Sequence, residues 1–166
     1  MTGPRENRML RAMSLRVVVA DRARARIYEV PRVRGPLRLV EQLDDPQAHW
    51  HDRDFKSDRP GRVFDHASGG GRRGAVAHHG TQGERSPSKH EAEVFAHRIV
   101  AALEQARAQF TRLALVAEPG FLGQLRAVLP HSLQAAVVLE IPKDLVHLDE
   151  GALDEALSPA LYANPA

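Results

Sequence analysis

The chain has 166 residues, the length of one ordinary domain, and it contains no cysteine, which excludes disulfide bonds and thiolate metal sites. No apolar run reaches the roughly 18–20 residues of a transmembrane helix, and no segment has the pattern of a signal peptide, so we expect a cytoplasmic protein. The net charge of +2 divides into +7 over residues 1–38, 0 over 39–90 and −5 over 91–166, which favours an anionic partner. A general preference for arginine over lysine, which occurs only three times, explains the same pattern equally well.

The first part of the chain predicts a leader followed by a hairpin. Residues 1–13 lack hydrophobic periodicity and are interpreted as a disordered leader. Residues 17–20 form a β-branched run of buried-strand type, and Asp21-Arg22 is the expected turn into a second strand that ends at Val30. Its alternation places small or apolar side chains on one face and the others opposite: Ala23, Ala25 and Ile27 against Arg24, Arg26 and Tyr28.

A third strand is predicted over residues 37–43, after a turn from Pro31 to Pro36. Strict alternation would place four of its side chains on one face: Leu37, Leu39, Glu41 and Leu43.

The second half predicts the order α-β-α-β-α. Ser88 as N-cap and Glu91 complete a capping box for a helix that runs to about residue 109. Apolar strands are expected at 113–117 and 135–141, with a helix from Pro119 to near Pro130 between them and a short last helix at 148–157. Strands that are apolar on both sides and bracketed by helices are typical of parallel neighbours buried in a mixed sheet. We therefore predict one α/β sandwich domain over residues 14–158, with a tail at 159–166.

The polar, glycine-rich stretch 44–87 is predicted to carry the functional contacts, because a compact domain seldom keeps more than roughly 12–15 structureless residues without a role for them. Glycines let backbone N–H groups approach phosphates, and arginine forks bind phosphates through paired hydrogen bonds. The candidates for RNA or anion binding are Arg53, Arg59, Arg62, Gly69, Gly70, Gly71, Arg72, Arg73, Arg85 and Lys89. A flexible arginine–glycine spacer is the alternative interpretation.

The sequence indicates metal binding and catalysis less strongly than it indicates anion binding. The candidate metal ligands are His49, His51, Asp52 and Asp54, whose spacing matches no metal-site signature, so polar loop side chains are the preferred interpretation. A ribonuclease-H-type nuclease would gather acidic groups around two metal ions, here Asp21, Glu29, Glu91 and Asp144, although a turn role for Asp21 is favoured. With no cysteine and no Gly-x-Ser-x-Gly motif, we assign no catalytic residue and expect no cofactor.

Five segments resemble the bacterial host attachment protein family: 18–28, 52–62 with Asp-Arg-Pro-Gly-Arg, 90–96, 115–123 with Pro-Gly-Phe-Leu-Gly, and 143–148. The resemblance covers about residues 15–157. That family is similar, more distantly, to the middle domain of archaeal and eukaryotic class-1 peptide-chain release factors. The resemblance implies a ribonuclease-H-like three-layer sandwich with a mixed sheet of about five strands and a long inserted Gly/Arg-rich loop.

One departure limits what the resemblance implies. The release factors carry Gly-Gly-Gln on this loop, whereas here Gly69, Gly70 and Gly71 are followed by Arg72 and Arg73, so peptide release is not implied. The leading hypothesis is a non-enzymatic cytoplasmic binding protein that presents the Arg/Gly loop to RNA, in particular on the ribosome. The first alternative is a factor required for attachment to host cells or surfaces, which needs export. The second is a metal-dependent phosphoester hydrolase, which needs bound metal.

Overall fold

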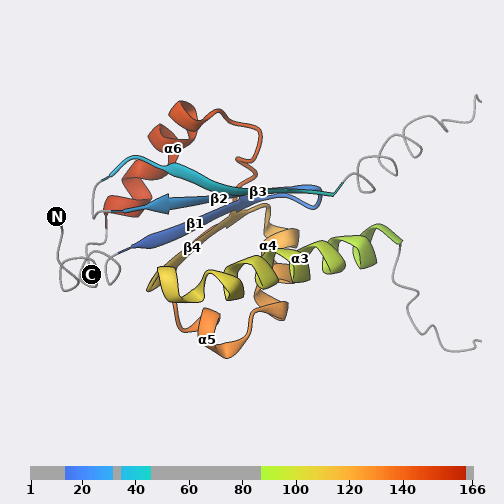
Figure 1. Ribbon diagram of the computed structural model, residues 1–166. Coiled ribbons are helices and arrows are strands. Elements are labelled where there is room, and N and C mark those ends of the chain that lie inside the picture. The colour runs from blue at the N-terminus through green and yellow to red at the C-terminus, as the bar shows by residue number, and fades with distance from the viewer. Residues whose placement is uncertain (1–13, 32–34, 46–86, 164–166) are drawn as a thin grey trace, which may run out of the picture.

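A computed structural model describes residues 14–31, 35–45 and 87–163, which form a mixed β-sheet with helices on both faces (Figure 1). Five strands lie in the order β3-β2-β1-β4-β5. β2 is antiparallel to β1 and β3, while β4 is parallel to β1 and β5. The strands are β1 (Leu15–Ala20), β2 (Arg24–Val30), β3 (Arg38–Asp44), β4 (Arg112–Ala117) and β5 (Val137–Ile141).

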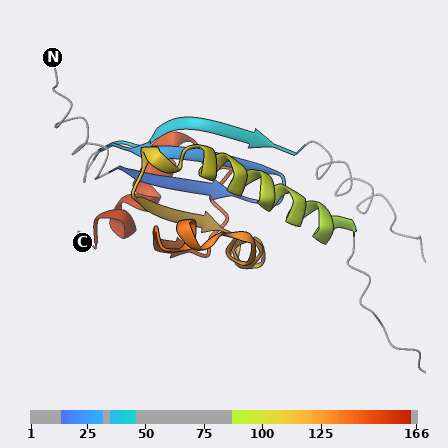
Figure 2. The same cartoon turned by 60° about the horizontal axis from the view of Figure 1, so that its bottom comes forward.

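The helices of the described residues cover the two faces unequally. α3, α4 and α5 lie on one face, and α6 lies on the other (Figures 1 and 2). Their bounds are α3 (Pro87–Gln105), followed by the 3-10 turn η1 (Arg107–Gln109), α4 (Pro119–Val128), α5 (His131–Gln134) and α6 (Glu150–Tyr162). The predicted α/β class, with a mixed five-stranded sheet between helical layers, is confirmed.

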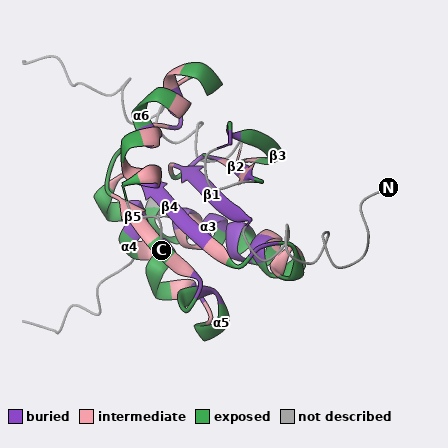
Figure 3. Ribbon diagram, turned by 90° about the vertical axis from the view of Figure 1, so that its left-hand side faces the viewer, coloured by how far each residue is buried: buried purple, intermediate pink, exposed green. Residues whose placement is uncertain are grey.

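The buried centre of the molecule is formed by β1 and β4 (Figure 3). All six residues of β1 and five of the six in β4 are buried, because helices cover both faces of these strands. On the α3 side, the rings of Phe95 and Phe121 stack with centroids 6.2 Å apart over the sheet. On the α6 side, Leu153 and Leu157 belong with Val17 to one buried apolar cluster. Burial on two faces explains why these strands read as continuous apolar runs in the sequence.

The β1–β2 hairpin has the turn that was predicted at Asp21. Its Oδ1 accepts hydrogen bonds from the backbone N–H groups of Ala23, at 2.8 Å, and Arg24, at 2.7 Å. A carboxylate that accepts from the backbone two residues ahead stabilises a tight turn without glycine. The turn role of Asp21 is therefore confirmed.

The edge strand β3 contains a β-bulge at Val40. Leu39 lies opposite Tyr28 on the α6 side, whereas Glu41 lies opposite Ile27 on the α3 side. An extra residue in one strand shifts the alternation of every side chain beyond it. The prediction that these side chains share one face is therefore wrong. The bulge leaves Leu37 and Leu39 on the α6 side and places Glu41 and Leu43 on the α3 side.

The other outer strand, β5, has a bulge at Val138, between the pairs Leu113–Val137 and Ala114–Leu139. The predicted parallel arrangement of β4 and β5 is confirmed. The expectation that both strands are buried holds for β4 only, since none of the five residues of β5 is buried and Val138 is 48% exposed. The reason is position: β5 is outermost in the sheet, so it has a neighbour on one side only.

The helix boundaries differ from the predicted ones. α3 begins at Pro87, one residue before the predicted N-cap Ser88, and gives way after Gln105 to the 3-10 turn. The short helix α5 was not predicted. α6 starts after Asp149, whose Oδ1 accepts from the Ala152 N–H at 2.8 Å, and it continues beyond residue 157 to Tyr162. Its extra turn adds a third buried leucine at four-residue spacing to the stripe Leu153, Leu157 and Leu161.

Candidate functional site

One edge of the sheet, which we call the carboxyl edge, is where the parallel strands β1, β4 and β5 end. β3 ends at the same edge, at Asp44, because it runs in the same direction as β1. The first turns of α3 project past the strands on this side, as two views of the molecule show (Figures 1 and 2). The two ends of the 44–87 stretch, at the end of β3 and the start of α3, therefore both lie on the side of the carboxyl edge.

The connections of the sheet diverge at the carboxyl edge between β1 and β4. The chain leaves β1 toward β2 on one side and leaves β4 through α4 toward β5 on the other. In α/β sheets, ligands bind preferentially outside the carboxyl ends of the strands at such a switch point. This position makes the carboxyl edge the candidate site of the described structure.

Arg22 and Glu118 meet at the switch point. Arg22 follows β1, Glu118 follows β4, and Arg22 Nε donates to Glu118 Oε1 at 3.2 Å. Both side chains are partly exposed, at 52% and 36%. Gly120 leaves room beside the pair, because a Cβ at this position would lie 3.3 Å from Glu118 Oε1 and 3.6 Å from Arg22 Nη2.

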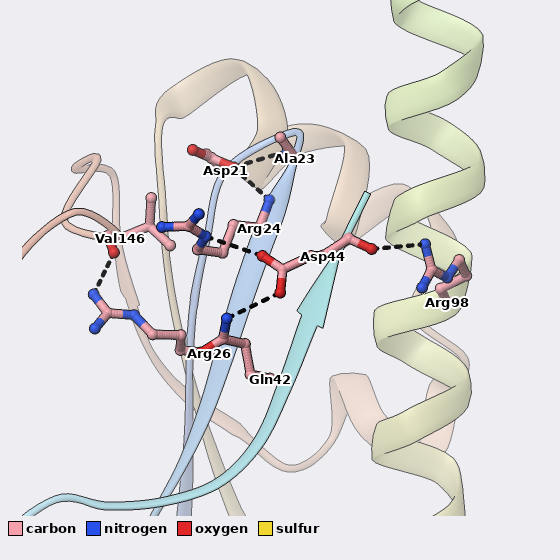
Figure 4. Close-up of polar contacts among 8 residues, drawn as sticks. All are labelled: Asp21, Ala23, Arg24, Arg26, Gln42, Asp44, Arg98 and Val146. Atoms are coloured by element: carbon pink, nitrogen blue, oxygen red, sulfur yellow. Dashed lines mark hydrogen bonds and ion pairs between the residues drawn. The ribbon is translucent and has the colours of Figure 1, made fainter. Parts of the chain in front are cut away.

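Asp44 connects three elements of the carboxyl edge (Figure 4). Its Oδ1 accepts from Arg24 Nε at 3.0 Å, and its Oδ2 accepts from Gln42 Nε2 at 2.9 Å. Its backbone carbonyl accepts from Arg98 Nη1 of α3 at 3.3 Å. The last residue of β3 thus ties β2, β3 and α3 together next to the 46–86 segment.

A neighbouring contact holds the connection between β5 and α6 against the sheet. Arg26 of β2 donates through Nη2 to the backbone carbonyls of Val146 and Leu148. Its guanidinium also lies over the Tyr28 ring, 5.9 Å from the centroid. Burial raises the pKa of the Tyr28 hydroxyl, an effect that the nearby Arg26 charge opposes. This arrangement positions the β5–α6 connection rather than offering an open site.

The opposite edge of the sheet contains a buried arginine. Arg16 of β1 is 3% exposed, donates to Gln109 Oε1 at 2.6 Å and lies over the Phe110 ring, 5.8 Å from its centroid. Burial lowers the pKa of Arg16, and the negative charge of Glu29 acts in the opposite direction. The contact joins β1 to η1 across the core and has a structural role. No sequence pattern indicated it, because an arginine in an apolar strand reads as a surface residue.

The structure does not gather the proposed nuclease residues. Asp21 lies at the hairpin turn, whereas Glu29 pairs with Arg38 at the far end of β2. Within residues 14–31, 35–45 and 87–163, no three His, Asp or Glu side chains are close enough together to hold a metal ion. None of the helices in these ranges combines the length and the hydrophobicity of a membrane span.

Most of the predicted contact residues lie outside the described residues. Lys89 is described, and it is exposed in the first turn of α3. The remaining candidates for RNA or anion binding lie outside the described residues: Arg53, Arg59, Arg62, Gly69, Gly70, Gly71, Arg72, Arg73 and Arg85. The candidate metal ligands also lie outside them: His49, His51, Asp52 and Asp54. The fold also brings Glu118 and Arg98 to the carboxyl edge, and the sequence analysis did not single out either of them. It named Arg22 only as a turn residue and Asp44 only as the start of the 44–87 stretch.

Comparison with known proteins identifies the family. No curated protein sequence matches the chain. A family model described as "Protein required for attachment to host cells" matches residues 16–157, which is nearly the whole described domain. That range agrees with the resemblance seen in the sequence. The chain therefore belongs to the host attachment protein family.

Proposed function

We propose that this protein is a non-enzymatic binding protein of the cytoplasm that contacts RNA, in particular on the ribosome, through the Arg/Gly-rich 44–87 segment. The observation that carries the proposal is the concentration of arginine and glycine in Gly69-Gly-Gly-Arg-Arg-Gly74. Backbone N–H groups at glycines and the forked donors of Arg72 and Arg73 match phosphate oxygens. The position of the segment supports the proposal, since both of its ends lie on the side of the carboxyl edge, where ligands of α/β sheets bind.

We also propose that the sheet is of the ribonuclease-H-like type found in the release-factor middle domain. Two features support this finer assignment: the strand order β3-β2-β1-β4-β5, and the directions of the strands. β2 is antiparallel to β1 and β3, and β4 is parallel to β1 and β5. In such a domain the segment between the third strand and the next helix presents the functional loop. Because Arg72 follows the glycines instead of glutamine, the proposed role is binding to RNA and not release of a peptide.

The test is sedimentation of the protein with ribosomal particles. Lysate of cells producing the protein at natural level is separated on sucrose gradients at low and high salt, with ribonuclease-treated lysate as a control. We expect co-migration with ribosomal particles at low salt, and its loss at high salt, because phosphate contacts weaken log-linearly with salt. An Arg72→Ala/Arg73→Ala variant should stay at the top of the gradient. The matched variant Arg112→Ala/Arg126→Ala, which removes two arginines from the folded domain, should still co-migrate.

Sedimentation of the unaltered protein only at the top of the gradient in every condition contradicts the ribosome proposal. Equal co-migration of the Arg72→Ala/Arg73→Ala variant contradicts the assignment of the contact to that segment.

A second candidate function is a part in attachment to host cells, which the description of the matched family favours. This function requires the protein outside intact cells or on their surface. Protease treatment of intact cells tests it, with a cytoplasmic protein as control: digestion of this chain while the control survives supports attachment. Protection of the chain until the cells are lysed contradicts a direct role at the surface.

A further inference from the structure

Three arginines from different elements line the carboxyl edge. Arg22 lies in the β1–β2 turn, Arg24 begins β2, and Arg98 lies on α3. The Arg22 and Arg24 side chains are 52% and 45% exposed, and Arg98 is exposed as well. Asp44 contacts two of them, Arg24 through its carboxylate and Arg98 through its backbone carbonyl, so these two flank the end of β3 (Figure 4).

Each of these arginines uses one nitrogen atom in a hydrogen bond, and the Arg98 guanidinium also lies over the Phe95 ring, 5.5 Å from its centroid. Arg22 uses Nε toward Glu118, Arg24 uses Nε toward Asp44, and Arg98 uses Nη1 toward the Asp44 carbonyl. Among the described residues, their other guanidinium nitrogens have no hydrogen-bond partner. Arg126 differs, because both its Nε and its Nη2 are engaged by the carboxylate of Glu140.

A guanidinium has five N–H donors, so an arginine that uses one nitrogen internally keeps a pair of donors for a second acceptor. The internal contact also restricts the long side chain before binding, which reduces the entropy lost when a ligand is bound. The acceptors at this edge thus act as orienting groups. Phosphate oxygens are ligands that suit several separate arginine forks.

We propose that Arg22, Arg24 and Arg98 are additional contacts to the phosphates of the RNA that the 44–87 segment binds. This inference rests on the proposed function and extends it from that segment to the folded domain. The strand of nucleic acid then crosses the carboxyl edge from the hairpin turn toward α3. Arg22 sits at the switch point between β1 and β4, where the sheet topology itself favours a ligand.

The test is the salt dependence of binding to a fluorescein-labelled single-stranded oligouridylate, followed by fluorescence anisotropy with the purified full chain. The edge variant carries Arg22→Gln, Arg24→Gln and Arg98→Gln. The control variant carries Arg38→Gln, Arg112→Gln and Arg126→Gln, which removes the same charge, and two ion pairs, from residues outside the proposed contact. Circular dichroism and thermal unfolding verify that each variant is folded.

Each phosphate contact to single-stranded nucleic acid contributes about 0.7 to the slope of log affinity against log salt, so the edge variant should lose about 2 from the magnitude of that slope. The control variant should keep the slope of the unaltered protein. If the edge variant does not fold, Arg22→Gln alone, which alters an exposed turn, should lower the slope by about 0.7.

The outcomes separate the inference from the proposed function. Equal slopes for the edge variant and the unaltered protein, with binding lost in Arg72→Ala/Arg73→Ala, overturn the inference and leave the proposed function intact. Equal loss in the edge and control variants also overturns it, since net charge then explains the effect. No binding of RNA by the unaltered protein overturns both.

Discussion

Arg98 of α3 donates a hydrogen bond to the backbone carbonyl of Asp44, 54 residues earlier in the chain, at 3.3 Å. The contact joins the end of β3 to α3, the two elements that precede and follow, in the sequence, the segment predicted to carry function. The carboxylate of the same residue accepts from Arg24 of β2, so Asp44 links two arginines of different elements. The fold therefore brings together, at one edge, side chains from elements that are far apart in the sequence.

Asp21 should contribute to stability through its oxygen atom rather than through its charge. Asp21→Ala leaves two backbone N–H groups of the turn without their acceptor, and we expect a loss of about 1–2 kcal/mol in the free energy of unfolding. Asp21→Asn retains the acceptor and should cost less than about 0.5 kcal/mol. Urea unfolding of the two variants measures the difference. Equal losses in both would show that the charge, and not the turn, is what matters.

Arg16 should stabilise the protein mainly by the packing of its apolar stem. Arg16→Met keeps much of the volume beside Phe110 and removes a buried charge, so we expect stability within about 1 kcal/mol of the unaltered chain. Arg16→Ala opens a cavity and should cost about 2–4 kcal/mol. Guanidinium chloride unfolding distinguishes them. A methionine variant as unstable as the alanine variant contradicts this explanation and assigns the effect to the Gln109 hydrogen bond.

Tyr28 should make stability fall at high pH. Burial raises its pKa above the ordinary value of 10.0, so the unfolded chain loses the phenolic proton at a pH where the folded chain still holds it. This contribution is complete below pH 10.0 and is lost as the pH rises toward the folded pKa. Tyr28→Phe removes this dependence and, because the hydroxyl has no partner among the described residues, should cost little at neutral pH.

The measurement for Tyr28 is the free energy of unfolding of both chains between neutral and strongly alkaline pH. The two curves should converge or cross as the pH rises. Tyr162→Phe is the control, since that hydroxyl donates to the Gly35 carbonyl and belongs to a less buried ring. Parallel curves for Tyr28→Phe and the unaltered chain contradict the prediction.

The two glycines of α4 provide a paired test of the crowding around Arg22 and Glu118. Gly123 has open space at its Cβ position, so Gly123→Ala should stabilise the helix by about 0.5–1 kcal/mol. Gly120→Ala should gain less, because its Cβ would come within 3.3 Å of Glu118 Oε1 and displace that carboxylate. Thermal unfolding of both variants gives the comparison. An equal gain at the two positions would mean that the pair moves aside without cost.

The sequence predicted those elements whose physical cause is local or periodic. β1 and β4 were recognisable because burial on two faces requires continuous apolar residues, and Asp21 because a turn without glycine favours such a side chain. The bulges were not predictable. The extra residue at Val40 moves the following side chains of β3 to the other face of the sheet, but it leaves no mark in the amino-acid composition of the strand. The Arg22–Glu118 pair was missed for another reason: it joins residues 96 positions apart, and only the sheet order brings them together.

The bulges in the two outer strands, at Val40 and Val138, bear on how this protein behaves at high concentration. An open sheet exposes a ladder of backbone donors and acceptors on each side, and identical molecules can stack on such ladders into filaments. At each side, the bulge breaks the regular spacing of those groups near a half-exposed valine. A second molecule that paired with either outer strand of the described sheet would meet backbone groups out of register at the bulge, so this geometry disfavours growth by strand stacking.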